Sequence, residues 1–268
     1  MTHEDVADFT TVDQTADPGF FVRFLDEANK LPTIVVPKEI IIDGLRLRGG
    51  ERVLDVGCGM GADVFDLAAK VGATGHVTGI DISASVIAEA RRRAEGRHLP
   101  VSFEIGDSQS LHFADGTFDA VRTERMLMHV PDAERAFGEM ARVLRPGGRM
   151  SVFDFDWETQ FCDSPLRAVT RKIAQSFCDG IKHGWIGRQL PRLFKRHRLT
   201  DISVVYHTVT VPFAFLQLLL GGHVARAVAS GTLSSTEANT WWMALARADR
   251  EGTFLYGFTA MIVAGTKT

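Results

Sequence analysis

Short apolar runs alternate with amphipathic segments through the first 160 residues of this chain. Each run is apolar at consecutive positions, which is typical of parallel strands that are buried on both faces. The segments between the runs space their apolar residues three and four positions apart, which predicts helices. This regular alternation favours an α/β fold with a doubly wound, mostly parallel sheet. The predicted strands are 52–56, 76–81, 101–105, 118–123 and 150–155, and the predicted helices between them are 61–70, 84–95 and 131–144.

The pattern changes after residue 160. A helix is predicted near 165–180 and a strand at 202–210, and a last strand follows at 254–264. The stretch between these two strands, 211–250, is mostly helical in pattern. Within it, Ser234 and Glu237 have the spacing of a capping box that opens a final helix. The last two strands are predicted to pair antiparallel, which brings the sheet to seven strands.

The N-terminal part of the chain precedes the first strand. Residues 1–17 are expected to lack regular structure, whereas 18–31 have a helical apolar pattern. The pattern stops at Leu31-Pro32 and resumes from Pro37, which suits the first position of a helix. We interpret the chain as one domain, 1–268, with three parts. These are an N-terminal helical cap (1–48), a core (49–160) and a helical insertion (211–250).

The run from Val53 to Gly61 ends in an acid, Asp55, and then three alternating glycines, Gly57, Gly59 and Gly61. Alternating glycines let the backbone turn tightly and approach a ligand closely. A turn of this kind between a strand and a helix is where α/β sheets bind nucleotides. The spacing also fits the dinucleotide fingerprint of dehydrogenases, so the loop alone leaves two cofactor classes open.

Later segments distinguish the two classes. Asp81 ends the second strand and is placed to bind a ribose in either class. It is followed by Gly106-Asp107-Ser108, by Phe118-Asp119-Ala120-Val121, by His129-Val130-Pro131-Asp132 and by Arg145-Pro146-Gly147-Gly148. With Asp55 two positions before the first glycine, this series resembles the class I S-adenosylmethionine-dependent methyltransferases. It is most similar to the small-molecule enzymes of the ubiquinone/menaquinone methyltransferase-like family, over residues 51–155. The antiparallel ending also fits this Rossmann-like methyltransferase sheet, which the plain dehydrogenase sheet lacks.

The resemblance implies S-adenosylmethionine as the methyl donor and S-adenosylhomocysteine as the product. It also implies ten cofactor-binding positions, which run from the amino-acid end of the cofactor to its base. Those implied near the amino acid are Asp55, Gly57, Thr123 and Glu124; those that allow close backbone approach are Gly59 and Gly61; the ribose position is Asp81; and the adenine positions are Ile82, Asp107 and Ser108.

Methyl transfer requires alignment of the acceptor and removal of its proton. A general base contributes about 10²–10⁴-fold, mostly for hydroxyl or carbon acceptors. His129 is the leading candidate for the base because it follows the fourth strand, although a structural histidine fits equally well. Asp154, with Asp156 and Glu158 on the same side of the fifth strand, is a candidate to position a hydroxyl or an amine. No metal site is predicted. Its ligands would have to come from more than one segment, and no such set is evident in the sequence.

Bulky aromatic residues in 18–36 and 211–250 favour a small, largely apolar acceptor. Trp241-Trp242 and the run Phe213–Leu216 read either as a lid over the substrate or as the core of the extra helices. The methylated atom is left open among oxygen, nitrogen and carbon. Two alternatives on the same fold are a cofactor-dependent cyclase or isomerase, and a cofactor-binding scaffold without transfer.

Composition limits the classes of binding partner and the cellular location that the sequence indicates. The net charge is −3 and the basic clusters are short, so a nucleic-acid surface is not indicated. The three cysteines, Cys58, Cys162 and Cys178, have neither zinc-site nor disulfide spacing, which fits a cytoplasmic setting. No apolar run is long enough to span a membrane, and the polar, acidic start does not resemble a signal peptide. A homodimer is left open.

Overall fold

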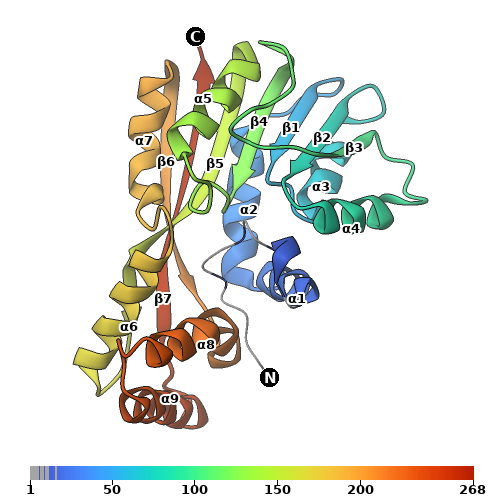
Figure 1. Cartoon of the computed structure of the whole chain (residues 1–268). Coiled ribbons are helices and arrows are strands. Elements are labelled where there is room, and N and C mark those ends of the chain that lie inside the picture. Colours follow the sequence, from blue (N-terminus) through green and yellow to red (C-terminus); the bar gives the residue numbers. More distant parts are fainter. Residues whose placement is uncertain (1–5, 7–8, 10–11, 16) are drawn as a thin grey trace.

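The computed structural model describes residues 6, 9, 12–15 and 17–268. At its centre lies a seven-stranded sheet in the order β3-β2-β1-β4-β5-β7-β6 (Figure 1). Neighbouring strands from β3 to β5 are parallel, whereas β7 is antiparallel to both β5 and β6. This arrangement confirms the predicted sheet and its reversed last strand. The strands are β1 (Arg52–Val56), β2 (His76–Asp81), β3 (Val101–Ile105), β4 (Phe118–Glu124), β5 (Leu144–Cys162), β6 (Leu199–Thr210) and β7 (Tyr256–Lys267).

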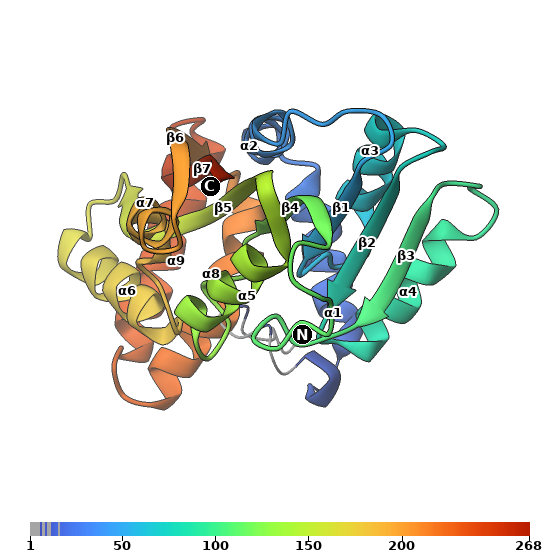
Figure 2. The same ribbon diagram turned by 90° about the horizontal axis from the view of Figure 1, so that it is seen from above.

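Helices cover both faces of the sheet. α2 (Pro32–Gly44) and α3 (Ala62–Val71) lie on one face, and α5 (Ala133–Val143) and α7 (Ile186–Arg196) lie on the other (Figure 2). α4 (Ala84–Ala94) packs against β2 and β3. The remaining helices gather beyond the carboxyl ends of the parallel strands (Figure 1). They are α1 (Pro18–Asn29), α6 (Arg167–Gly180), α8 (Phe213–Ala229) and α9 (Ser235–Arg250).

The core is formed by the apolar runs of the strands and by the helical residues that are apolar at every third or fourth position. In β1, the side chains of Val53, Leu54 and Val56 are fully buried, because helices cover the central strands on both faces. In α5, Phe137 and Met140 are likewise buried against the sheet. The strand starts predicted for β1, β2, β3 and β4 coincide with the observed ones.

The start of α2 differs from the prediction. The helix begins at Pro32, and Pro37 lies inside it. An internal proline lacks an N–H group and removes one helical hydrogen bond. Burial of Ile34 and Ile41, in a helix that packs on β5 and β7, offsets this loss. Local propensity was therefore overridden by tertiary packing.

Three further elements were not anticipated. Helix α7 contains Pro191 and many basic residues, but it buries Leu190, Leu193 and Phe194 as one stripe. Strand β5 is much longer than the predicted 150–155 and includes Arg145–Gly148, which were expected only to end the preceding helix. In the N-terminal segment, residues Val12–Gln14 form a short 3-10 helix, so the expectation of irregular structure is wrong for them.

The insertion contains two helices, and the second begins as predicted. The Ser234 hydroxyl accepts the Glu237 backbone N–H at 3.1 Å, and the Glu237 carboxylate accepts the Ser234 backbone N–H at 2.8 Å. This confirms the capping box at the start of α9. Within the described residues, no helix has both the length and the apolar character that crossing a bilayer requires.

Replacing Ser234 with alanine removes one half of this capping box. We expect the free energy of unfolding to fall by about 0.5–2 kcal/mol, because an N-terminal N–H group of α9 loses its acceptor. Ser235→Ala, one position inside the helix, is the matched control and should change stability much less. Urea denaturation followed by circular dichroism measures both; equal effects of the two variants would contradict the prediction.

Candidate functional site

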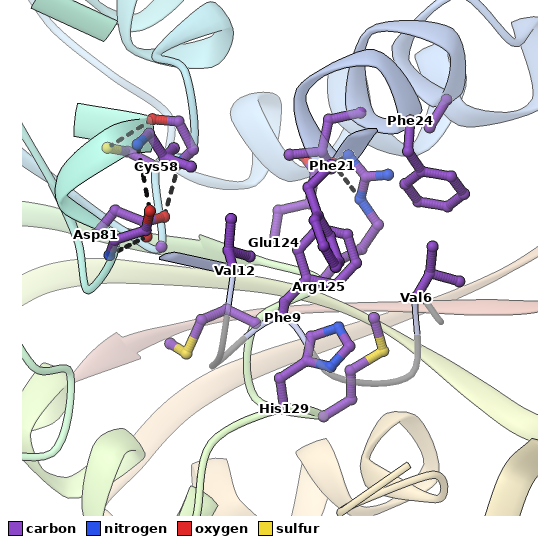
Figure 3. Close-up of a pocket in the computed structure, with 18 of the residues that line it drawn as sticks. Val6, Phe9, Val12, Phe21, Phe24, Cys58, Asp81, Glu124, Arg125 and His129 are labelled. Carbon is purple, nitrogen blue, oxygen red and sulfur yellow. Dashed lines mark hydrogen bonds and ion pairs between the residues drawn. The ribbon is translucent and has the colours of Figure 1, made fainter. Parts of the chain in front are cut away.

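A large cavity opens at the carboxyl ends of the parallel strands. It contains about 1670 Å³ of space outside the atoms, part of which is continuous with solvent. Most of its lining comes from the ends of β1, β2 and β4 and the loops after β1–β4, from β5 and β7, from α1, α2, α6 and α8, and from the described N-terminal residues Val6, Phe9 and Val12. Figure 3 shows Cys58 and Asp81 on one side of it and Phe24 on the other, with His129 lower in the view, beside Phe9.

The glycine loop after β1 forms one wall. The backbone N–H groups of Gly57 and Cys58 both donate to the Ile80 carbonyl, which ties the loop to β2. Gly57 has a φ of +73°, and a Cβ atom there would lie 2.6 Å from Cγ of Met126. Only glycine therefore fits at this position. The loop leaves its backbone exposed to the cavity, as a close-fitting ligand requires.

Asp81 lies beside this loop at the end of β2. Its carboxylate accepts the backbone N–H of Gly59 at 3.1 Å and that of Ser83 at 3.0 Å. Burial raises the pKa of Asp81 above its ordinary value, although these hydrogen bonds oppose the shift. The next residue, Ile82, is 52% exposed and lines the cavity. An apolar side chain held open at a cavity wall offers a flat surface for a planar ring.

The loop after β3 completes this end of the cavity. Asp107 and Ser108 both line it. The Asp107 carboxylate accepts the backbone N–H of Gln109 at 2.8 Å, which orients the side chain. The structure thus brings the predicted ribose and adenine positions together around one space.

Charged side chains form a buried cluster beneath the glycine loop. Arg122 and Asp55 are each 1% exposed at the side chain, and Arg122 Nη1 lies 3.1 Å from Asp55 Oδ2. The same Nη1 lies 3.1 Å from Asp63 Oδ2, and Nη2 lies 2.6 Å from Glu124 Oε2. Lys38 of α2 joins the cluster at 2.6 Å from Asp63 and 3.0 Å from Glu124.

Two atoms of this cluster have no hydrogen-bond partner among the described residues. They are Oδ1 of Asp55 and Nε of Arg122, and both are buried. Burial raises the pKa of Asp55 to about 6, although the ion pair with Arg122 opposes the shift. An unpaired acceptor and an unpaired donor therefore occur in one ion pair.

His129 lines the cavity from the loop after β4. It is 6% exposed, and its ring centroid is 5.0 Å from that of Phe9 (Figure 3). Nearby, Arg125 has a φ of +53°, a strained conformation for a non-glycine residue. Its guanidinium contacts Glu124 at 2.7 Å and donates to Asn29 of α1 at 3.0 Å. The contact with Asn29 links the loop after β4 to the N-terminal cap.

The opposite end of the cavity is aromatic. Phe155, Trp157, Phe177 and Phe258 form a cluster whose neighbouring ring centroids lie 4.5–5.0 Å apart. The indole N–H of Trp157 donates to Sδ of Met128 at 3.2 Å. In the described lining, β5, β7, α6 and α8 contribute no charged side chain. This end is suited to an apolar guest.

The stacked rings of Phe24 and Phe215, with centroids 5.4 Å apart, join α1 to α8 beside this aromatic end. Phe215 and Leu219 of α8 are the described residues of 211–250, besides Val211, that line the cavity. Trp241 of α9 instead donates its indole N–H to the Thr170 hydroxyl at 2.9 Å, against α6. Core packing, rather than contact with the cavity, accounts for Trp241.

Three predicted site residues do not line the described cavity: Gly61, Thr123 and Asp154. Gly61 has a φ of +79°, and a Cβ atom there would lie 2.5 Å from the Phe103 ring, so it is needed for packing at the start of α3. The Thr123 hydroxyl donates to the Val56 carbonyl at 2.7 Å and joins β4 to β1.

Asp154 is fully buried behind the loop that carries His129. Its carboxylate accepts the backbone N–H of Met128 at 3.3 Å and that of Phe155 at 3.1 Å. This placement corrects the expectation that Asp154 faces the acceptor: it holds the loop in place. Asp156 is paired with Arg188. No set of three or more His, Cys, Asp or Glu side chains in the described part of the chain is grouped to bind a metal ion.

Sequence reasoning did not identify Arg122, Asp63 or Lys38 as site residues. A signal for Arg122 was present, because an arginine in a strand predicted to be buried on both faces needs buried partners of opposite charge. Lys38 and Asp63 carry no such signal. Their role arises from the packing of α2 against α3 and β4.

Comparison with known proteins decides between the two cofactor classes. A family model described as a methyltransferase domain matches residues 47–198. The chain belongs to the methyltransferase-domain family. The methyl donor of this family is S-adenosylmethionine.

Individual relatives and one solved structure are similar to this chain. The methyltransferase is 36% identical over 254 residues to an uncharacterised 37.1 kDa protein in a transposon of Streptomyces fradiae, with 92% of this chain and 71% of that protein covered. It is 36% identical over 140 residues to methyltransferase GfsG of Streptomyces halstedii, of which it spans about half (52% of this chain, 49% of GfsG). Its fold resembles that of a geranyl diphosphate methyltransferase in complex with S-adenosylmethionine, with a TM-score of 0.57, 21% identity, and coverage of 100% of this chain and 98% of that one.

The residues of the cavity fit this methyl donor. Gly59 lines the cavity with a φ of +53°, and a Cβ atom there would meet only Cδ1 of Leu25, at 3.9 Å, so the missing side chain leaves room for a ligand. Asp81 stands at the strand end where a ribose binds, and Ile82 offers an open apolar surface. Asp55, which lines the cavity, carries a carboxylate of the charge that suits a cationic ammonium group. The cavity therefore offers groups suited to the ribose, the base and the ammonium group of this cofactor.

Replacing Asp154 with asparagine tests whether this buried carboxyl group is protonated in the folded protein. Burial raises its pKa from 3.8 to about 7, so the folded state holds a proton that the unfolded state releases above pH 4. The resulting stabilisation is present below pH 4 and is lost as pH rises to 7. Relative to the asparagine variant, the wild type should lose up to about 1.4 kcal/mol of unfolding free energy per pH unit in this window. Denaturant unfolding from pH 4 to 8 measures this difference, and a difference that does not change with pH would contradict it.

Proposed function

We propose that this protein transfers a methyl group from S-adenosylmethionine to an oxygen, nitrogen or carbon atom of a small, largely apolar metabolite. One observation supports the proposal most directly. A single cavity joins a glycine-lined, charged side at β1 and β2 to an aromatic side at β5 and β7, and His129 lines it from the loop after β4, the strand between these two pairs. The charged end is complementary to the donor, and the aromatic end to an apolar acceptor.

We assign the cofactor to the loops after β1, β2 and β3. Gly57 and Gly59 allow its close approach, Asp81 accepts the ribose hydroxyls, and Ile82 packs on the adenine. Asp107 and Ser108 bind the adenine edge, and Asp55 and Glu124 lie at the amino-acid end. Gly61 and Thr123 support this site from behind, through Phe103 and Val56.

The parts of the chain then have distinct roles. Residues 49–160 hold the cofactor, and the helices α1 and α2 of the N-terminal cap (1–48) cover it. Asn29 and Lys38 join these helices to Arg125 and Asp63 of the core. In the insertion 211–250, α8 closes the acceptor end with Phe215 and Leu219, while α9 supports α8 from outside.

S-adenosylmethionine, when bound, supplies a methyl carbon already activated by a sulfonium. The chain must then align the acceptor, exclude water and accept a proton. The aromatic end excludes water from an apolar acceptor. His129 is the residue at the junction with an imidazole suited to accept a proton.

Cofactor binding tests the proposal. We expect S-adenosylhomocysteine to bind in isothermal titration, and Asp81→Ala to weaken binding about 10- to 100-fold through loss of charge-assisted hydrogen bonds to the ribose. Asp43→Asn, at an exposed carboxylate on α2, is the control and should bind like the wild type. Absence of binding by the wild type would refute the proposal. Labelled product from methyl-labelled donor and a panel of apolar acceptors separates transfer from cyclisation, isomerisation or a scaffold role.

His129→Ala tests the proton acceptor. We expect kcat for a hydroxyl acceptor to fall about 10²- to 10⁴-fold with the affinity for S-adenosylhomocysteine unchanged, because the base acts only in the chemical step. His112→Ala, at an exposed histidine paired with Glu104, is the control. If kcat is retained while the melting temperature falls, the role of His129 is structural.

A further inference from the structure

The described lining of the cavity carries an excess of negative charge. Its charged side chains, His129 aside, are five carboxylates and three cations. The N-terminal residues that the structure does not describe add neither lysine nor arginine, because Arg23 is the first of either kind in the chain. A cavity with a dominant sign of charge attracts ligands of the opposite sign and repels those of the same sign. The carboxylates are Asp55, Asp63, Asp81, Asp107 and Glu124, and the cations are Lys38, Arg122 and Arg125.

Glu124, at the carboxyl end of β4, contacts all three of these cations. Its Oε1 lies 3.0 Å from Nζ of Lys38 and 2.7 Å from Nη2 of Arg125. Its Oε2 lies 2.6 Å from Nη2 of Arg122. The Glu124 side chain is 5% exposed, so water screens these contacts little. A single carboxylate therefore pairs with every cation of the described lining.

A cation that is already paired is a poor site for an anionic ligand. Phosphate and carboxylate groups are recognised through charge-assisted hydrogen bonds to arginine and lysine. Here Glu124 occupies the same cations. An anionic group would have to break one of its ion pairs or lie beside its carboxylate, where two like charges repel each other strongly.

The aromatic side of the described lining adds no compensation for an anion. The rings of Phe155, Phe177 and Phe258 are apolar, and the indole N–H of Trp157 is already donated to Sδ of Met128 at 3.2 Å. A charged group that leaves water without a partner loses its hydration at a large cost. An uncharged group avoids this cost and gains from the burial of its apolar surface.

The cofactor does not reverse the excess of negative charge. Its amino-acid part carries one ammonium and one carboxylate and is neutral overall. The sulfonium of S-adenosylmethionine offsets one of the two excess negative charges, and S-adenosylhomocysteine offsets neither. An anionic acceptor would therefore add its charge to a site that is negative with either form of the cofactor bound.

We propose that the methyl acceptor is an uncharged molecule, and that Glu124 enforces this selectivity by pairing the cations that would otherwise attract an anionic group into the cavity. The inference rests on the proposed function. It narrows the acceptor to compounds without a phosphate, carboxylate or sulfate group. It also gives Glu124 a role in acceptor specificity, in addition to its place at the amino-acid end of the cofactor.

Two fluorescent probes that differ by one sulfonate test the selectivity. N-phenylnaphthylamine is uncharged, anilinonaphthalene sulfonate is its anionic counterpart, and both brighten in an apolar site. The full chain, saturated with S-adenosylhomocysteine, is titrated at pH 8, where Asp55 is ionised although burial raises its pKa to about 6. In the wild type we expect the uncharged probe to bind about 10- to 100-fold more tightly, because the sulfonate meets an uncompensated negative charge.

Glu124→Gln keeps the shape of the side chain and removes its charge. We expect this variant to bind the anionic probe about tenfold more tightly than the wild type, and the uncharged probe within about threefold of it. Asp66→Asn is the matched control. It makes the same change at an exposed carboxylate on α3, one turn after Asp63, that does not line the described cavity. The ratio of the two affinities should stay at its wild-type value there.

Lys38→Met tests the same balance from the opposite side, and it provides the test if Glu124→Gln does not fold. It removes one of the three cations and leaves Glu124 with fewer partners. We expect it to weaken binding of the anionic probe further, about three- to tenfold, and to change the uncharged probe less. Anionic-probe binding that strengthens in Lys38→Met would contradict the role of Glu124.

The outcomes separate the inference from the proposed function. Equal affinities of the two probes in the wild type, or an unchanged ratio in a folded Glu124→Gln, overturn the inference, while S-adenosylhomocysteine binding leaves the proposed function standing. A ratio that falls equally in Asp66→Asn would assign the selectivity to total charge and overturn the role of Glu124. Failure of the wild type to bind S-adenosylhomocysteine overturns both.

Discussion

The buried ion pair between Asp55 and Arg122 is the contact on which the organisation of the cavity depends. It joins the two central strands at the edge where the glycine loop begins. Because both groups lie in a medium of low polarity, each must keep its partners. The requirement extends outwards to Asp63 on α3 and to Lys38 on α2. One pair of charges thereby links the sheet, the helix after the glycine loop and the N-terminal cap.

The strand order of the sheet places different kinds of side chain on the two sides of β4. β3, β2 and β1 end in the loops that carry Asp107, Asp81 and the glycines, on one side of β4. β5 and β7 lie on the other side, extend further and contribute Phe155, Trp157 and Phe258. The loop after β4 stands between them and presents His129. A donor and an acceptor bound in the two halves would therefore meet at this loop.

Asp154 lies behind the cavity wall and supports the site without lining it. Its sequence position, at the end of β5 where many α/β proteins place functional groups, predicted contact with the acceptor. The structure instead directs its carboxylate to the backbone of Met128. The same loop begins at Arg125, which has a positive φ of 53°.

The sequence by itself determined the strands of the core, the capping box of α9 and the glycine loop, because hydrophobic periodicity, capping and tight turns are local properties. It also indicated Asp55 and Asp81. Both residues belong to the same βαβ unit as the glycines, so their positions relative to the glycine loop can be predicted from local sequence. It did not determine the start of α2, the existence of α7 or the length of β5, which depend on burial against distant strands. Nor could it show that Lys38 and Asp63 would surround Arg122, or that Asp154 would face away from the cavity. These are decided by which side chains from separate elements share a buried space, where the lack of water makes unpaired charges costly.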